Sequence, residues 1–154
     1  MEPLEILLAI EEIRRLKGRY FRCLDTKDWD GWAEVFTEDA TLQFDLSVST
    51  LGRDGLPSPK LTGKAEILAF VARDLATAQT VHHGHTPEIE ITGETAARGV
   101  WAMQDVVDHG EVVLRGCGHY RETYRKEGGA WRIASSHLTR LSLSKEERNR
   151  ISLP

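Results

Sequence analysis

The first part of the chain has the hydrophobic spacing of helices. Between residues 4 and 25, apolar side chains recur at steps of three and four, and most charged residues lie off that stripe. This spacing predicts an amphipathic helix over 4–25. A short second helix should follow, capped by Asp28 or Asp30, because the next aromatic side chains, beginning with Trp29 and Trp32, would share one face.

The pattern then changes twice before the middle of the chain. Residues 40–47 alternate apolar and polar side chains, which predicts a strand. Residues 47–62 carry several Gly and Pro residues and predict a long loop, and such a loop in a compact domain is typical of a lid or binding element. Residues 63–78 return to helical spacing and predict a third helix.

From residue 80 onward the period is that of strands. Short gaps containing Gly separate the apolar runs, so we expect antiparallel hairpins. The predicted strands are 80–92, 95–108, 111–126 and 130–142. Helices segregated on such a sheet define the α+β class, and a strongly curved sheet wrapped around three N-terminal helices would form a cone with an internal pocket. We expect one domain over 1–154, with a core of about 6–142 and a loose polar tail over 143–154.

Composition narrows the possible partners. The chain has 154 residues and a net charge of −4, which argues against nucleic acid or an anionic membrane surface as a partner. The N-terminus is too charged for a signal peptide, and no apolar run approaches membrane length. Cys23 and Cys117 lie far apart without a CxxC motif, so we expect reduced thiols and a cytoplasmic protein.

Two polar residues near the end of the first helix are candidates for chemistry. Tyr20 lies on the apolar stripe, so its ring should face the interior. Asp25 lies where the helix ends, and the helix dipole disfavours a carboxylate there. The alternative is a core tyrosine with a satisfied hydroxyl and an ordinary turn aspartate.

Asp105 is a carboxylate in an apolar strand. Alternation places it on the same face as Trp101, Met103 and Val107. If that face is buried, the carboxylate needs a partner. Two alternatives stay open, namely that this face is the outer one or that a bulge turns Asp105 away.

The run "VHHGHTPEIE" holds three of the six histidines. Strict alternation places His83 and His85 on the face of the isoleucines that follow, and His82 on the other face, but Gly84 and Pro87 favour a bulge that would upset this parity. A metal site needs three or four converging ligands, and no third ligand stands at a recognisable spacing. We therefore expect no metal and favour a single acid–base histidine.

Three stretches carry a resemblance to a known family. "IEEIRRLKGRYFRCLDTKDWD", "HHGHTPEIEIT" and "YRKEGGAWRI" resemble the SnoaL-like, scytalone dehydratase-like branch of the nuclear-transport-factor-2-like superfamily, and most closely its bacterial bile acid 7α-dehydratases. The resemblance covers roughly residues 6–142. It implies the cone fold, catalysis without a metal or other cofactor, and a homotrimer.

The resemblance also implies roles for individual residues. His82 matches the catalytic base, Asp25 the aspartate that pairs with it, and Tyr20 the catalytic tyrosine. Asp105 matches a pocket aspartate with a catalytic role, and Arg140 matches a further pocket arginine.

Two departures from the family bear on the substrate. Phe44 stands where these relatives have a tyrosine, so one hydroxyl donor is missing. Residues 105–107 hold no counterpart of the second catalytic histidine of scytalone dehydratases, which counts against scytalone itself. Phe44, Trp101 and Met103 would supply apolar contacts for a polycyclic substrate.

The implied activity is that of a dehydratase. Such a carbon–oxygen lyase would remove water from a small hydrophobic polycyclic substrate, such as a 7α-hydroxy-3-oxo-4-ene steroid or bile acid. A non-catalytic ligand-binding protein is the alternative from another class, because this fold serves carriers as well as enzymes. An isomerase, a polyketide cyclase and a dehydrohalogenase are the alternatives among enzymes.

Overall fold

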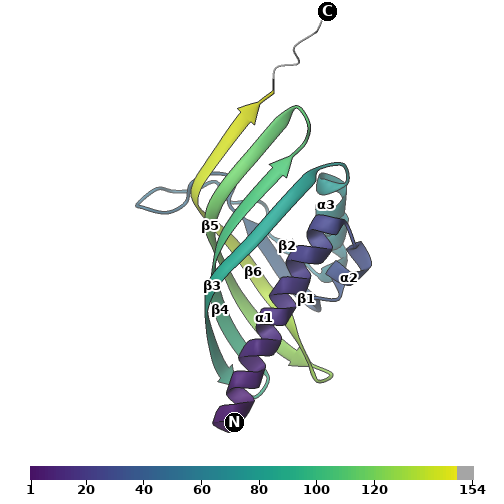
Figure 1. The fold of residues 1–154 in the computed structure, drawn as a ribbon, viewed down its shortest axis with the longest axis vertical. Coiled ribbons are helices and arrows are strands. Elements are labelled where there is room, and N and C mark those ends of the chain that lie inside the picture. The colour runs from purple at the N-terminus through teal and green to yellow at the C-terminus, as the bar shows by residue number, and fades with distance from the viewer. Residues whose placement is uncertain (149–154) are drawn as a thin grey trace, which may run out of the picture.

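A computed structural model describes residues 1–148 of the chain and confirms the α+β class (Figure 1). Three helices and a six-stranded sheet follow one another in the order α1, α2, β1, β2, α3 and β3 to β6. The helices are α1 (Pro3–Thr26), α2 (Trp29–Ala33) and α3 (Lys64–Leu75). The strands are β1 (Phe36–Phe44), β2 (Leu61–Thr62), β3 (Gln79–Gly93), β4 (Ala96–Asp108), β5 (Val112–Glu127) and β6 (Ala130–Glu147).

The sheet is open, mixed and strongly curved. Its strand order is β2-β1-β6-β5-β4-β3, and every neighbouring pair is antiparallel except β1 and β6, which run parallel. Register shifts interrupt the pairing of β3 with β4 and of β5 with β6. An extra residue at such a shift bends its strand and increases the local twist, which helps the long strands to curve around the helices.

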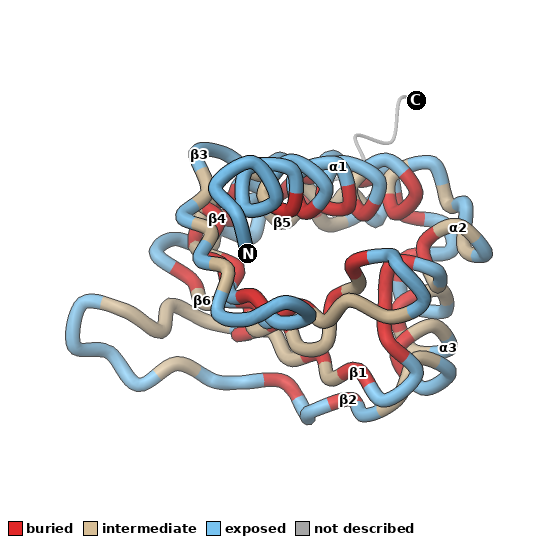
Figure 2. Tube along the Cα trace, turned by 90° about the horizontal axis from the view of Figure 1, so that it is seen from below, coloured by how far each residue is buried: buried red, intermediate tan, exposed pale blue. Residues whose placement is uncertain are grey.

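The helices bury their apolar stripes against the inside of this curve. Figure 2 shows the buried positions of α1 on the side that faces the sheet, and its exposed positions on the outside. The capping residue of α2 is Asp28, whose side chain accepts a hydrogen bond from the Gly31 N–H at 3.0 Å. Trp32 and Ile67, from α2 and α3, are fully buried at one end of the molecule.

Two predicted boundaries are wrong. β1 begins at Phe36 rather than at residue 40, so Phe36 belongs to the sheet and not to the second helix. Residues 143–147 are not a loose tail, because they continue β6 and pair with β5, for example Lys145 with Leu114. The remainder of the predicted tail, 149–154, lies outside the described residues.

The predicted loop after β1 projects from the sheet (Figure 2). Its base is closed by a bridge between Asp45 and Pro57 and by a hydrogen bond from Leu46 N–H to the Leu56 carbonyl. Leu51, at the far part of the loop, is 84% exposed. The loop therefore extends away from the body of the molecule rather than folding over it.

Two observations bear on the predicted cellular environment. Both cysteines are free, and Cys23 is buried in the core. Over residues 1–148, no helix has the length and apolar character needed to cross a membrane.

Candidate active site

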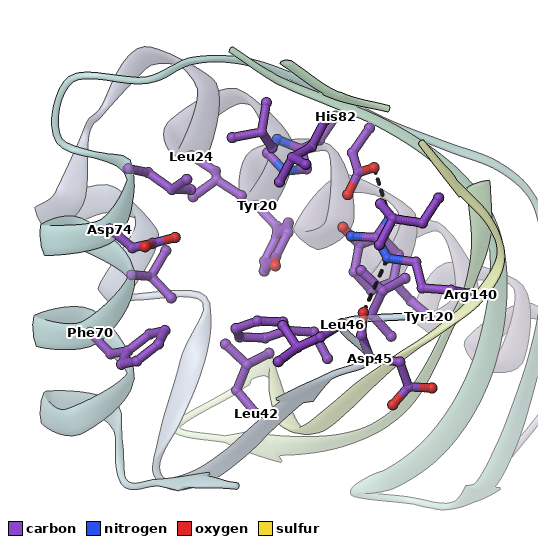
Figure 3. Close-up of a pocket in the computed structure, with 18 of the residues that line it drawn as sticks. Tyr20, Leu24, Leu42, Asp45, Leu46, Phe70, Asp74, His82, Tyr120 and Arg140 are labelled. Atoms are coloured by element: carbon purple, nitrogen blue, oxygen red, sulfur yellow. Dashed lines mark hydrogen bonds and ion pairs between the residues drawn. The ribbon is translucent and has the colours of Figure 1, made fainter. Parts of the chain in front are cut away.

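A cavity of about 280 Å³ opens between α1, α3 and the inside of the sheet (Figure 3). This volume is near the lower end of the roughly 300–1,000 Å³ range of ligand pockets. Most of its lining is apolar, including Leu24, Leu42, Phe44, Phe70, Leu75 and Leu138. Its polar side chains come from α1, α3 and β3 to β6 and from residues just after β1 and β4, so residues distant in sequence converge on one space.

His82 and Asp25 form a close pair at this cavity. The ring Nδ1 of His82 lies 2.6 Å from Asp25 Oδ1, and the His82 backbone N–H donates to Oδ2 at 2.9 Å. The hydroxyl of Thr80 donates to Oδ1 at 2.9 Å. The side chain of His82 is 7% exposed. Because Nδ1 faces Asp25, Nε2 is the ring nitrogen left for a bound molecule.

The surroundings of Asp25 favour its charged form. Burial alone would raise the pKa of Asp25, but the hydrogen bonds from the His82 ring, the His82 backbone and the Thr80 hydroxyl outweigh burial and hold this pKa below its usual value. Lys27, just after α1, donates to the Thr80 hydroxyl at 2.8 Å, and burial lowers the pKa of this lysine while Asp25 opposes that shift. An ionised Asp25 can hold a neutral His82 in one tautomer and stabilise it when it gains a proton.

Tyr20 supplies a proton donor. Its side chain projects from α1 into the cavity, between His82 and Tyr120 in Figure 3. Burial raises the pKa of Tyr20, and the nearby Glu122 carboxylate raises it further, while a hydrogen bond with Tyr120 acts in the opposite direction. Tyr20 is therefore protonated near neutral pH and can donate its hydrogen to an oxygen in the cavity.

Asp105 faces inward and its partner is Arg140. Arg140 Nη1 lies 2.7 Å from Asp105 Oδ1, and both side chains are buried. Arg140 Nε also donates to the Asp45 carbonyl at 3.4 Å. A side chain at Gly116, which faces this pair from β5, would overlap both the guanidinium and the carboxylate. Glycine at this position therefore leaves the space that the ion pair occupies.

Two residues expected to contact the substrate do not line the cavity. Trp101 and Met103 share the inward face of β4 with Asp105, but they pack with Tyr120 and Leu138 in a separate cluster. The predicted inward face of β4 is correct. The cavity, however, lies at the end of β4 that holds Asp105 and Val107, so Trp101 and Met103 are buried in the core and do not reach it. Phe44 does line the cavity, with its ring centroid 6.1 Å from that of Phe70.

The histidine run shows where alternation fails. The predicted bulge is present, since the register of β3 against β4 shifts between His85 and Glu88. His83 and His85 are exposed, whereas Ile89 packs against the core. The face assignment from strict alternation is therefore wrong, because the bulge moves the inward side from even to odd positions.

Sequence reasoning missed several polar groups of the cavity, among them Tyr120 and Asp74. Tyr120 lies on its wall, with its ring centroid 6.0 Å from that of Tyr20. The alternation of Tyr120, Glu122 and Tyr124 along one strand was a usable signal for an inward polar row. Asp74 of α3 lies at the cavity as well, and its position in an exposed helical turn gave no such signal.

No clustered metal ligands are found in the part of the chain that the structure describes. Among residues 1–148, no three His, Cys, Asp or Glu side chains gather closely enough to hold a metal ion. The polar groups that line the cavity include His82, which Asp25 orients, the two phenols of Tyr20 and Tyr120, and the ion pair of Asp105 with Arg140.

The curved sheet, the three helices and the cavity between them define the chain as an α+β protein of the nuclear-transport-factor-2-like fold. Comparison with family models makes this specific: residues 5–137 match the SnoaL-like domain. The chain belongs to the SnoaL-like family.

Known relatives span several activities. The chain is 27% identical over 133 residues to "Probable cyclase FGR4" of Gibberella zeae, covering 84% of this chain and 89% of that protein. A candidate scytalone dehydratase from Novosphingobium aromaticivorans shares its fold with a TM-score of 0.73 at 19% identity over 96% of each chain. A type 2 hexachlorocyclohexane dehydrochlorinase does so with a TM-score of 0.76 at 15% identity over 99% of each chain. Proteins named as a cyclase, a dehydratase and a dehydrochlorinase are thus similar to this chain in sequence or in fold.

Proposed function

We propose that the protein is a dehydratase that eliminates water from a hydroxylated polycyclic ketone, with a 7α-hydroxy-3-oxo-4-ene steroid as the specific candidate. The observation that carries this proposal is the His82–Asp25 pair at 2.6 Å, with the second ring nitrogen left for an otherwise apolar cavity. A base held by a carboxylate suits removal of a proton from carbon. A carrier of apolar ligands has no use for such a pair.

The proton transfers balance without a cofactor. In the candidate steroid, the ketone acidifies the C6 proton through the conjugated double bond. His82 Nε2 takes this proton, and the electron pair left on carbon forms the new double bond as the C7–oxygen bond breaks. Tyr20 gives its proton to the departing hydroxyl, which leaves as water, and His82 afterwards returns its proton to the phenolate.

The Asp105–Arg140 pair supports the same reaction. The two charges neutralise each other, so the pair adds polarity to the wall without leaving an uncompensated buried charge. Asp105 keeps a carboxylate beside the cavity that can accept a hydrogen bond from the departing water. Because the cavity has a volume of only about 280 Å³, a four-ring substrate would fill it completely.

Incubation with 7α-hydroxy-4-cholesten-3-one tests the proposal. The expected product is the 4,6-dien-3-one, which absorbs at longer wavelength than the substrate, and His82→Ala should form none. The same reaction in D₂O separates a dehydratase from an isomerase, because an isomerase would exchange carbon-bound hydrogen without losing water. Absence of water loss from this steroid and from a panel of smaller cyclic hydroxy ketones would contradict the proposal.

The homotrimer implied by the family resemblance is also a proposal. Apolar side chains on the outer face of the sheet support an interface, since Val81 and Leu141 are 48% and 40% exposed. Sedimentation at micromolar concentration should give a trimer, and a monomer would contradict it.

A further inference from the structure

A fully buried lysine lies beneath the cavity and has no part in the mechanism above. Lys17 of α1 is 0% exposed, and its Nζ lies 2.6 Å from Glu122 Oε1 of β5, which is equally buried. Burial lowers the pKa of Lys17, and the Glu122 carboxylate opposes that shift. Lysine is among the residues least often buried completely, so this pair calls for an explanation.

The carboxylate of the pair is held by two further donors. Ser136 Oγ donates to Glu122 Oε1 at 2.9 Å, and the hydroxyl of Tyr124 donates to Oε2 at 2.6 Å. Tyr124 in turn accepts a hydrogen bond from Trp101 Nε1 at 2.8 Å. Glu122 is therefore fixed in position by groups from β5 and β6 as well as by Lys17.

The ammonium of the pair packs against the phenol rings of the cavity wall. Lys17 Nζ lies 3.6 Å from the ring centroid of Tyr120 and 4.1 Å from that of Tyr20. Both tyrosines line the cavity and Lys17 does not, so the rings separate the ammonium from a bound ligand. A cation against ring faces attracts them electrostatically, more strongly where water is excluded.

We propose that Lys17 and Glu122 are positioning residues that hold the phenols of Tyr20 and Tyr120 in the orientation needed for proton donation into the cavity. The inference rests on the proposed function, because that function supplies the substrate oxygen to which the phenols would donate. Stability alone does not account for the pair, because replacing a buried ion pair with well-packed neutral groups is often neutral or stabilising. The chain has three tyrosines, and all three contact Lys17 or Glu122.

Because the chain has only three tyrosines, the orientation of each ring can be followed by NMR without measuring turnover. Protein labelled with 3-fluorotyrosine should give three fluorine resonances, one for each tyrosine. The test compares the unmodified sequence with the double variant Lys17→Met/Glu122→Gln, which removes both charges and keeps similar side-chain volumes. The control is Lys64→Met/Glu38→Gln, which makes the same changes in the ion pair between α3 and β1.

Positioning predicts a specific pattern. The double variant should melt close to the unmodified protein, yet its Tyr20 and Tyr120 resonances should broaden or split because the rings adopt several orientations. Its kcat should fall by about 10–100-fold, as expected for a misplaced catalytic group, while KM stays within about threefold. The control variant should keep three sharp resonances and the kcat of the unmodified protein.

The remaining outcomes decide against one proposal or the other. Sharp, unshifted resonances with kcat within about twofold would show that the pair only holds the core together, and a fall in kcat without a change in the resonances would also overturn positioning. If the double variant does not fold, Lys17→Gln/Glu122→Gln is measured in the same way, because it leaves no buried charge and the two amides can still form a hydrogen bond. If the unmodified protein turns over no hydroxy ketone, the dehydratase proposal fails, while the fluorine spectra still test the positioning.

Discussion

Among residues 1–148, two histidine–aspartate pairs lie in opposite settings. In the first, His82 Nδ1 meets Asp25 at 2.6 Å, and the histidine ring is 7% exposed beside the cavity. In the second, His137 Nε2 meets Asp45 at 2.9 Å, and the histidine side chain is 41% exposed. The carboxylate of Asp45 turns away from the centre of the cavity (Figure 3).

The comparison shows that residue types alone do not make a catalytic pair. The first pair leaves a ring nitrogen toward an apolar cavity with Tyr20 nearby, so a proton can move between the pair and a ligand. The second pair buries the carboxylate and exposes the histidine, next to the loop that follows β1, where it fastens β1 to β6. The same residue types are thus arranged for the proposed catalysis in one setting and for anchoring in the other.

The largest expected effect separates the two histidines directly. His82→Ala should reduce turnover of the hydroxy ketone by at least about 10²–10⁴-fold, the usual contribution of a general base. His137→Ala should leave turnover within about threefold, because His137 does not line the cavity. It should lower the melting temperature instead, because it leaves the buried Asp45 carboxylate without its partner. Initial rates of diene formation check both variants. Equal losses in the two would remove the distinction between the pairs.

The second prediction concerns the orienting carboxylate. Asp25→Asn should cost nearly as much turnover as His82→Ala, because the amide can hold the wrong tautomer and cannot stabilise the protonated ring. The double variant His82→Ala/Asp25→Asn should be little worse than either single one, since two groups acting as a unit are not additive. Rates of all three variants complete the cycle, and additive losses would mean that the two residues act independently.

A third, smaller effect is the loss of stability in acid. Because the pKa of Asp25 is lowered in the folded protein, its contribution to stability is present above its unfolded pKa and is lost as pH falls through the folded value. The difference in melting temperature between the unmodified protein and Asp25→Asn should therefore be constant near neutrality and shrink below about pH 4. Thermal unfolding between pH 7 and pH 2 measures it. If this difference in melting temperature grows as the pH falls, the pKa of Asp25 would be raised rather than lowered in the folded protein.

The smallest effects are expected for the neighbours of His82. His83→Ala and His85→Ala should each keep turnover within about twofold, because the two rings are exposed outside the cavity. Assays of the two variants beside His82→Ala check the register of β3. Loss of activity in His83→Ala with retention in His82→Ala would mean that the cavity-facing side of the strand was assigned to the wrong residue.

Much of the fold could be predicted because its periodicities are long and regular. The three helices and the four long strands follow from spacing in the sequence, as does the class. The extension of β6 could not be predicted, because residues 144–147 are polar and exposed and are held by backbone pairing with β5 rather than by burial. The start of β1 was missed for a related reason, since Phe36 continues the aromatic spacing of the helix before it.

The candidate site was predictable only in part. The family resemblance pointed to His82. Strict alternation, continued through the bulge, would have placed His83 and His85 on the inward face of Ile89, where they do not lie. The partner of Asp105 and the buried position of Lys17 could not be predicted, because each depends on a contact between distant parts of the chain. Helical spacing places Lys17 on the face of Ile13 and Tyr20, but Lys17 and Glu122 are 105 residues apart, and nothing local indicates the carboxylate that allows this lysine to be buried.

The parallel pairing of β1 with β6 has a consequence for how the protein acquires its site. Leu42 of β1 aligns with Ser136, so this strand lacks its main neighbour until most of the chain has been synthesised. Arg140 lies further along β6, and Asp105 therefore has no guanidinium partner before then. Contacts this distant in sequence form slowly, since a long loop must close first. On the ribosome, α1 would emerge early with its apolar stripe uncovered, and the cavity would be completed only at the last stage of folding.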